Sequence, residues 1–298
     1  MRRFASIVLA FGFLLASHNS SYAQTSVPTP SPTPHHLFVT DATTPQIIPS
    51  HFSKDGVLVQ GTINGHNFWF LLDSGTNSLA ISPRAAATAG ISENGSRRFV
   101  TDMDVGALHA HNCRFGRMKG EWVRPDGTVI TGLIGSAFFR SNVVMLDFQK
   151  HEVVVYPNGS FDASKIHGSA IDIGFIDQLP LVHVMFGDRR ATMLFDTGDD
   201  RTLLFQSFAK DAVVGPSLSG LGVGASFFVN SPSIPGQEFQ TKPISLGNFR
   251  FNMTRILIVD NEPVWMKTMF LDGLVGRDVF EAFRVTFDYA HDVVYLER

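Results

Sequence analysis

The chain has 298 residues with a formal net charge of -3, and 44% of its residues are hydrophobic, which is enough for one large or two small domains with a full core. The weak acidity and the lack of a basic stripe exclude nucleic acid from the expected partners. The single cysteine, Cys113, excludes an internal disulfide, so packing has to stabilise the fold.

The N-terminal residues predict export. Two arginines precede a short apolar run, and small residues follow it, so residues 1–23 read as a secretory signal peptide. The apolar run is too short to cross a bilayer, so we expect no stable membrane insertion after its removal. Alternating prolines predict that residues 24–45 form an extended linker. The expected location is therefore periplasmic or extracellular.

Short alternating apolar patterns make the rest of the chain predominantly β. A hairpin is predicted over residues 57–72, with its turn at Asn64-Gly65. A second hairpin is predicted over residues 181–195, with its turn at Gly187-Asp188. Residues 83–89 favour a short helix ended by a glycine.

Each hairpin ends in the same motif. The apolar run of the first hairpin stops at Asp73-Ser74-Gly75-Thr76, and that of the second stops at Asp196-Thr197-Gly198. An ionised carboxylate at the end of a buried strand has to be paired, hydrogen-bonded or kept protonated. A single motif of this kind predicts only a turn, but two in matched context predict a working pair.

The similarity between the halves continues beyond the motifs. Gly132-Leu133-Ile134-Gly135 in the first half matches Gly273-Leu274-Val275-Gly276 in the second. In both halves an aspartate, Asp147 or Asp288, follows the last glycine by twelve residues. We interpret the chain as a duplicated β unit, with a first lobe over 46–156 and a second lobe over 170–298. Asp147 and Asp288 lack a following hydroxyl-Gly turn, so we interpret both as structural.

If the lobes pack about a pseudo-twofold axis, Asp73 and Asp196 meet at the interface. Two neighbouring carboxylates cannot both ionise freely, so the pKa of one falls and that of the other rises. The ionised member can then take a proton from a water molecule that attacks an amide carbonyl, while the other member protonates the leaving amine. This chemistry needs no metal and no cofactor.

The residues beside the aspartates fit the same scheme. The hydroxyls of Ser74 and Thr197 are expected to hydrogen-bond the backbone of the opposite lobe. Gly75 and Gly198 should leave room for the backbone to approach and donate N–H groups to the carboxylates. We expect the Thr76 hydroxyl to support the Asp73 carboxylate.

The paired motifs, each followed by a Gly-apolar-apolar-Gly element, resemble those of the aspartic proteases. More narrowly, the chain is similar over residues 47–298 to the retropepsin-like aspartyl proteases of bacteria, with two units fused. The resemblance implies an all-β, two-lobed fold of closed units about a pseudo-twofold axis. It also implies a substrate cleft under a hairpin flap, with Asp73 and Asp196 as the catalytic residues. The implied partner is a peptide or unfolded protein segment, cleaved by a chain that can act as a monomer.

The resemblance also suggests where the flap lies. In the second lobe it falls near residues 218–228, with Gly222, Val223 and Gly224 as candidate substrate-binding residues. The corresponding stretch of the first lobe, residues 97–105, is short and charged. We therefore expect one flap to serve both lobes.

Two charged residues of the second lobe lack counterparts in the first. By resemblance, Arg277 is expected to pair with Asp200, whereas the first lobe has Ser136 and Asn77 at these places. Asp199 stands where the family usually carries a small residue. Either it raises the pH at which the dyad ionises, or it points away and pairs with Arg201, which we favour because a buried unpaired charge is costly.

Two other functions remain open at this stage. The first is a non-catalytic peptide-binding protein with the same fold. The second is a metal-binding protein, because His109, His111 and Cys113 fall on one strand face by period-2 spacing. Zinc requires a fourth ligand and convergence of all four, so a surface strand is the favoured interpretation of this segment.

Overall fold

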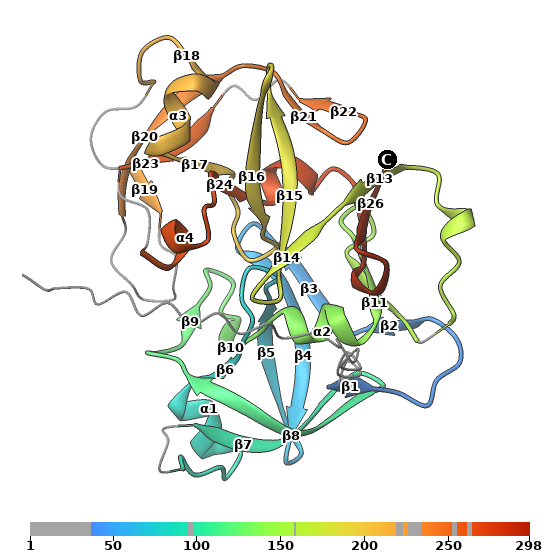
Figure 1. Cartoon of the computed structure of the whole chain (residues 1–298). Coiled ribbons are helices and arrows are strands. Elements are labelled where there is room, and N and C mark those ends of the chain that lie inside the picture. The colour runs from blue at the N-terminus through green and yellow to red at the C-terminus, as the bar shows by residue number, and fades with distance from the viewer. Residues whose placement is uncertain are drawn as a thin grey trace, which may run out of the picture. The chain divides into compact units, whose positions relative to one another are not determined.

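Figure 1 shows the chain as a computed structural model made mostly of short strands. The predicted signal peptide and most of the predicted linker lie outside the residues that the structure describes. Within the described part of the chain, no helix is both long and apolar enough to cross a membrane. The structure describes residues 37–94, 98–157, 159–218, 223–225, 234–251, 255–260 and 264–298.

Strands of the first lobe form a nine-stranded sheet in which six strands close into a barrel. The closure runs β4-β5-β10-β6-β8-β7 and returns from β7 to β4. The nine strands are β1 (Phe38–Val39), β3 (Ser50–Ser53), β4 (Gly56–Ile63), β5 (His66–Leu72), β6 (Leu79–Ile81), β7 (Phe99–Val105), β8 (Leu108–Arg117), β9 (Trp122–Val123) and β10 (Val129–Ile134).

The second lobe repeats the central pairings of this plan in an eleven-stranded sheet. β16 pairs in parallel with β24 as β5 does with β10, and β17 pairs in parallel with β23 as β6 does with β8. The predicted all-β, duplicated fold is therefore confirmed. The strands are β14 (Gly174–Ile176), β15 (Leu179–Phe186), β16 (Arg189–Phe195), β17 (Leu203–Phe205), β18 (Val213–Val214), β19 (Val223–Ala225), β20 (Ile234–Thr241), β21 (Ile244–Leu246), β22 (Phe249–Phe251), β23 (Ile256–Val259) and β24 (Gly273–Val275).

A six-stranded sheet joins the lobes, with three strands from each. The junction is the antiparallel pair β11–β25, where Asp147 lies opposite Arg284 and accepts from its Nε at 3.2 Å. Aromatic rings from the two lobes pack beside it, with Phe139 and Phe287 centroids 4.7 Å apart. The strands are β2 (Gln46–Ile48), β11 (Val143–Asp147), β12 (Glu152–Tyr156), β13 (Ser169–Asp172), β25 (Arg284–Asp288) and β26 (Val293–Glu297).

Helices are short and lie between strands. The predicted one is α1, where the Ser82 hydroxyl accepts from the amide of Ala85 at 3.0 Å and Gly90 follows with φ +70°. The helical segments are α1 (Pro83–Thr88), α2 (Ser136–Ser141), α3 (Gln206–Ala212), α4 (Val264–Thr268) and α5 (Arg277–Phe280), with the 3₁₀ turns η1 (Ala163–Lys165) and η2 (Tyr289–His291).

The folded part of the chain begins ahead of residue 46. β1 falls inside the range 24–45 that we predicted as linker, and it pairs with β8. Phe38 is completely buried, and its ring packs edge-on against Phe138 with centroids 5.2 Å apart. This residue follows Pro34, the last of the alternating prolines, by four positions, so the predicted linker is too long at its C-terminal end.

Candidate active site

Both motif aspartates stand at the ends of strands that pair in parallel with the Gly-apolar-apolar-Gly segment. The amide of Asp73 donates to the carbonyl of Ile134 at 2.9 Å, and the amide of Asp196 donates to that of Val275 at 3.0 Å. The same local pairing therefore delivers a carboxyl group from each lobe.

Two hydroxyls exchange hydrogen bonds between the lobes. The Ser74 hydroxyl donates to the carbonyl of Phe195 at 2.7 Å and accepts from the amide of Thr197 at 3.0 Å. The Thr197 hydroxyl donates to the carbonyl of Leu72 at 2.8 Å and accepts from the amide of Ser74 at 2.9 Å. Both residues are completely buried. Since a buried polar group without a partner is costly, these four bonds hold the motifs in one register.

The glycines of the motifs make room for the opposing carboxyl groups. A Cβ atom added to Gly75 would overlap the Asp196 carboxylate, and one added to Gly198 would overlap that of Asp73. The amide of Gly75 donates to Asp73 Oδ1 at 2.9 Å, and the amide of Gly198 donates to Asp196 Oδ1 at 2.8 Å. Each glycine thus supports its own aspartate while lying against the other.

The carboxyl groups of Asp73 and Asp196 lie close together at the centre of the two motifs, since each packs against the motif glycine of the opposite lobe. Burial raises the pKa of Asp73 to about 6, although the hydrogen bond with Asp196 opposes this shift. Burial, and then the charge of Asp73, hold the pKa of Asp196 well above its usual range. Both residues keep part of their surface open to solvent. The pair can therefore share one proton where water reaches it.

Thr76 supports the dyad differently from the prediction. Its hydroxyl accepts from the amide of Ser78 at 3.4 Å. The backbone N–H of Thr76 is one of the groups that lower the pKa of the Asp73 carboxyl, after the N–H of Gly75, and the N–H of Asp199 acts in the same way on Asp196, after that of Gly198. The backbone of the turn therefore supplies the donor to the carboxyl group, and the Thr76 hydroxyl stabilises the turn.

Asp199 is partly buried close to the dyad. Its carboxylate accepts from the backbone amide of Arg201 at 3.1 Å. The favoured charge pair between Asp199 and Arg201 is therefore wrong, because the Arg201 guanidinium donates to Glu238 at 3.2 Å. The other alternative agrees with the structure, since the charge of Asp199 is one of the causes that raise the pKa of Asp73. Burial, followed by the charge of Asp196, raises the pKa of Asp199 to about 7.

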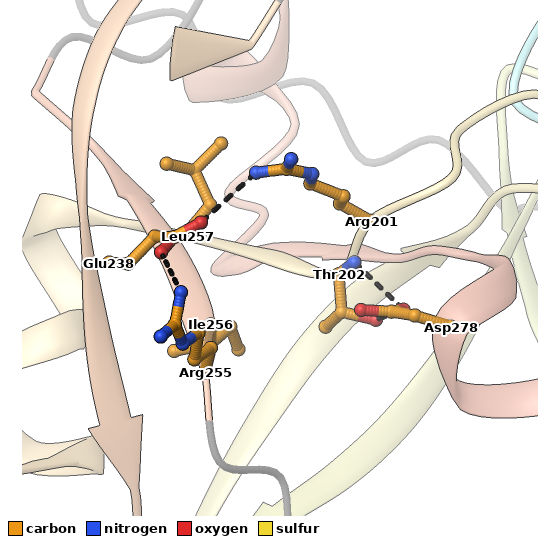
Figure 2. A pocket seen from close by; sticks show the side chains of 7 residues that line it. All are labelled: Arg201, Thr202, Glu238, Arg255, Ile256, Leu257 and Asp278. Atoms are coloured by element: carbon orange, nitrogen blue, oxygen red, sulfur yellow. Dashed lines mark hydrogen bonds and ion pairs between the residues drawn. The ribbon is translucent and has the colours of Figure 1, made fainter. Parts of the chain in front are cut away.

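Arg201 and Glu238 also border a hollow of about 200 Å³. Figure 2 shows the side chains that line it. Glu238 holds Arg201 through one carboxylate oxygen and Arg255 through the other, the latter at 3.3 Å. On the opposite side the Thr202 hydroxyl donates to Asp278 at 2.6 Å. Two cations and two acids therefore border the hollow, and the Glu238 carboxylate occupies a donor of each guanidinium.

The predicted pair between Arg277 and Asp200 is replaced by contacts to the backbone. The Arg277 guanidinium donates to the carbonyls of Ser53 at 2.9 Å, Lys54 at 2.6 Å and Asp199 at 3.3 Å. The charge of Asp200 acts only at longer range, as the strongest of several acids that oppose the lowering of the Arg277 pKa by burial. Two of the three carbonyls belong to the first lobe.

The first lobe has its own contact to the second. The Asn77 amide donates to the Asp177 carboxylate at 2.7 Å, in the two-residue turn between β14 and β15. The Arg277 contacts fall on the matching two-residue turn between β3 and β4. Neither turn was singled out from the sequence. A comparison of the strands that precede each hairpin would have placed them at equivalent positions.

The predicted flap lies partly within the described residues. Val223 and Gly224 lie in β19, which pairs with β20 from Val223–Gly236 to Ala225–Ile234. Gly222 lies outside the described residues, as does Arg97 at the start of the first-lobe counterpart. The rest of that counterpart forms β7, an antiparallel partner of β8.

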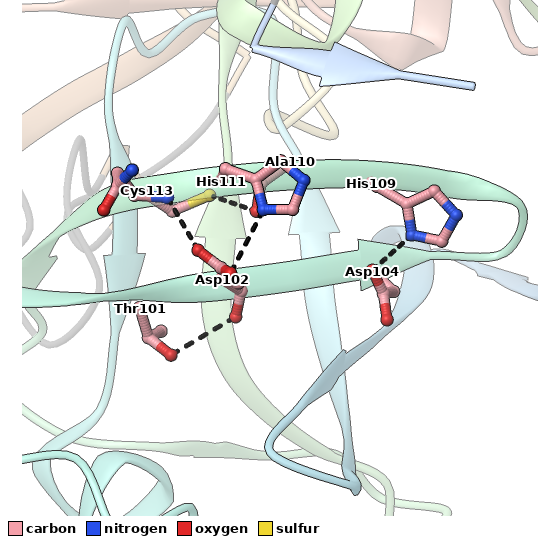
Figure 3. Close-up of polar contacts among 8 residues, drawn as sticks. Thr101, Asp102, Asp104, His109, Ala110, His111 and Cys113 are labelled. Atoms are coloured by element: carbon pink, nitrogen blue, oxygen red, sulfur yellow. Dashed lines mark hydrogen bonds and ion pairs between the residues drawn. The ribbon is translucent and has the colours of Figure 1, made fainter. Parts of the chain in front are cut away.

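Figure 3 shows that His109, His111 and Cys113 do not converge. Each histidine Nδ1 faces its own aspartate, His109 with Asp104 at 2.7 Å and His111 with Asp102 at 3.1 Å. The expected common face is wrong, because a left-handed residue before Cys113 interrupts the alternation and turns the thiol inward. Among the described residues, no three potential ligands gather to hold a metal ion.

Comparison with known protein families identifies the class to which the chain belongs. The aspartyl protease family model matches residues 59–138 and 182–279, one segment for each motif and more than half of the chain. The chain therefore belongs to the aspartyl protease family. A search of curated proteins finds no match. Among solved structures, the aspartic proteinase from Irpex lacteus is similar over 85% of this chain and 97% of its own, with 12% identity and a TM-score of 0.47.

Proposed function

We propose that the chain is an aspartic endopeptidase in which Asp73 and Asp196 together activate a water molecule. The observation that carries the proposal is the placement of two carboxyl groups, one from each lobe, each against the motif glycine of the opposite lobe. The four hydroxyl hydrogen bonds between the lobes support it, because they fix the geometry on which a shared proton depends.

The reaction starts with one proton on the dyad. The ionised carboxylate takes a proton from the water, whose oxygen forms a bond to the carbonyl carbon of the peptide. The protonated carboxyl transfers its proton to the carbonyl oxygen as negative charge develops there, so the intermediate is a neutral gem-diol and the dyad keeps the proton taken from the water. When the C–N bond breaks, the amine leaves with a proton from the dyad and the product acid returns one. The dyad then again holds a single proton.

The raised pKa values determine which pH range suits this reaction. With the pKa of Asp73 at about 6 and that of Asp196 higher, the form with Asp73 ionised and Asp196 protonated is populated above about pH 6. Activity should rise as pH increases through that value and fall when Asp196 loses its proton. We therefore expect an optimum that is only mildly acidic or neutral.

The proposed substrates are extended peptides or unfolded protein segments. Such a chain can add to a free strand edge and be held by main-chain hydrogen bonds, with side chains falling alternately on each face. The β19–β20 pair, whose first strand lies within the predicted flap, is the proposed cover for this peptide strand. Residues 1–23 support an exported enzyme that meets its substrates outside the cytoplasm.

The test is hydrolysis of a denatured protein by the wild type, Asp73→Asn and Asp196→Asn across pH 3–9. We expect cleavage by the wild type, inhibition by a statine-type compound, and a loss of about 10²–10⁴-fold or more in each variant. Peptide binding without cleavage would instead favour the non-catalytic peptide-binding protein. Equal cleavage by wild type and both variants would contradict the dyad.

The same variants provide their own folding control. Because burial raises the pKa of Asp73 from 3.8 to about 6, the folded state binds more protons than the unfolded state in that range. Stability of the wild type should therefore fall as pH rises through this window. Asparagine removes the effect, so each variant should melt at the same or a higher temperature than the wild type at pH 8.

A further inference from the structure

We propose that Arg277 is a positioning residue that sets the separation of the two dyad carboxyl groups by tying the second motif to the first lobe. The inference rests on the proposed function. Arg277 is only 2% exposed, and its guanidinium reaches three backbone carbonyls on two lobes. Such a buried cation with three acceptors is held in one geometry.

On the second-lobe side, Arg277 is bonded to the motif at both of its ends. The amide of Asp196 donates to Val275, two residues before Arg277. The amide of Arg277 donates to the carbonyl of Asp199 at 3.0 Å, and its Nε donates to the same oxygen. The segment from Asp196 to Asp199 therefore moves together with Arg277.

On the first-lobe side, the guanidinium meets a stiffened turn. The amide of Asp55 donates to the Ser53 hydroxyl at 3.1 Å, and Gly56 closes the turn with φ +136°. The Asp55 carboxylate faces Nε of Arg124, itself only 6% exposed, at 3.3 Å. The turn is thus held by a buried arginine from each lobe, so it can serve as a fixed reference for the second motif.

The first lobe contacts the second through a different residue, Asn77, and has no arginine at the place of Arg277. Its residue at the matching place is Ser136, whose amide donates to the carbonyl of Thr76 at 2.8 Å, as Arg277 does to Asp199. The Ser136 hydroxyl is buried and has no hydrogen-bond partner among the described residues. Only in the second lobe does the residue after the Gly-apolar-apolar-Gly segment reach across the interface.

The test compares Arg277→Lys, which keeps the charge, and Arg277→Met, which removes it. Lysine cannot reach three carbonyls in the planar fork of arginine. We expect kcat to fall by about 10- to 100-fold in both, with little change in KM, because the reacting groups are misplaced while the substrate contacts remain. The two titration steps of the dyad, followed by ¹³C NMR of labelled aspartates, should move closer together as the carboxyl groups separate.

Arg284→Met is the matched control. Arg284 also joins the lobes, through Asp147 in the central sheet, but it does not touch either motif. We expect it to lower the melting temperature and to leave the dyad titration unchanged. A dyad shift as large in this control as in Arg277→Lys would overturn the proposal, as would wild-type titration in a folded Arg277→Lys.

The NMR titration requires no turnover, so it separates this inference from the proposed function. If the wild type is inactive but substitution of Arg277 shifts the titration of the dyad, the proposed protease activity is contradicted and the positioning role of Arg277 is supported. If the Arg277 variants are active and their dyad titrates as in the wild type, the protease activity is supported and the positioning role is contradicted. If neither Arg277 variant folds, Asp55→Asn loosens the same turn from the first lobe, and its dyad titration decides the matter by the same criterion.

Discussion

The two lobes place the same kinds of residue at the dyad and different ones directly around it. Aspartate, hydroxyl residue and glycine occur in both motifs, with matching hydrogen bonds to within about 0.1 Å. Beyond them, the first lobe reaches its partner through the exposed Asn77, whereas the second reaches it through the buried Arg277. The two motifs are thus alike, but the contacts that hold each motif against the opposite lobe differ in residue type and in burial.

The difference teaches where symmetry is needed. Two carboxyl groups that share a proton require equal access to each other, so neither motif can change its hydroxyl or glycine alone. The contacts one step further out only have to keep the lobes in register, and unlike chemistry can do that. Losing the buried arginine should be far more damaging than losing an exposed amide, because it leaves buried carbonyls unsatisfied.

The largest effect should come from adding a methyl group to either glycine. Gly75→Ala and Gly198→Ala each place Cβ against the carboxylate of the opposite lobe, so we expect kcat/KM to fall by at least about 100-fold in both. Gly116→Ala is the control, since a Cβ there meets an atom only at 3.6 Å. Wild-type activity in Gly75→Ala would contradict the close approach of the two carboxyl groups.

Much of the centre of the site could be predicted from the sequence. An apolar strand that ends in a carboxylate, a hydroxyl and a glycine is conspicuous, and its repetition in matched context reveals the duplication. The turn residues also carry local information, so Asn64-Gly65 predicted its hairpin correctly. These features are readable because each is decided within a few consecutive residues.

The outer contacts could not be predicted because they depend on distant backbone. Arg277 was expected to choose the nearby acid Asp200, yet it donates to carbonyls more than 220 positions away in the chain. Every residue has a backbone carbonyl, so the identities of Ser53 and Lys54 do not predict that an arginine binds there. The prediction that Cys113 shares a strand face with the two histidines was wrong for a local reason, since a single left-handed residue, Asn112, places Cys113 on the opposite face.

A smaller effect is expected from Asp199→Asn, which removes a charge that the first motif, with Thr76 at the matching place, does not have. The charge of Asp199 raises the pKa of Asp73, so its removal should move the acidic limb of kcat/KM to lower pH. The shift should be small because Asp199, with a pKa of about 7, is mostly protonated at pH 6. A shift to higher pH would show that Asp199 acts on the dyad other than through its charge.

The same variant makes a signed prediction for stability. Since burial raises the pKa of Asp199 from 3.8 to about 7, the folded state binds the extra proton between these values, and the wild type loses stability as pH rises through them. Asp199→Asn lacks this loss. Urea unfolding should therefore show its advantage over the wild type growing from pH 4 to pH 7 and then levelling off.

The smallest effect should come from Asn77→Ala, which removes the lighter of the two contacts between the lobes. The hydrogen bond to Asp177 is solvent-exposed, so its loss should lower the free energy of unfolding by less than about 1 kcal/mol, because water replaces the missing partner. A double-mutant cycle with Asp177→Ala isolates the pair, and the dyad titration should not move. Asn77→Ala could instead reduce the difference between the two dyad pKa values as much as Arg277→Lys does. The two contacts would then position the carboxyl groups equally, and the unequal roles argued for the two lobes would be wrong.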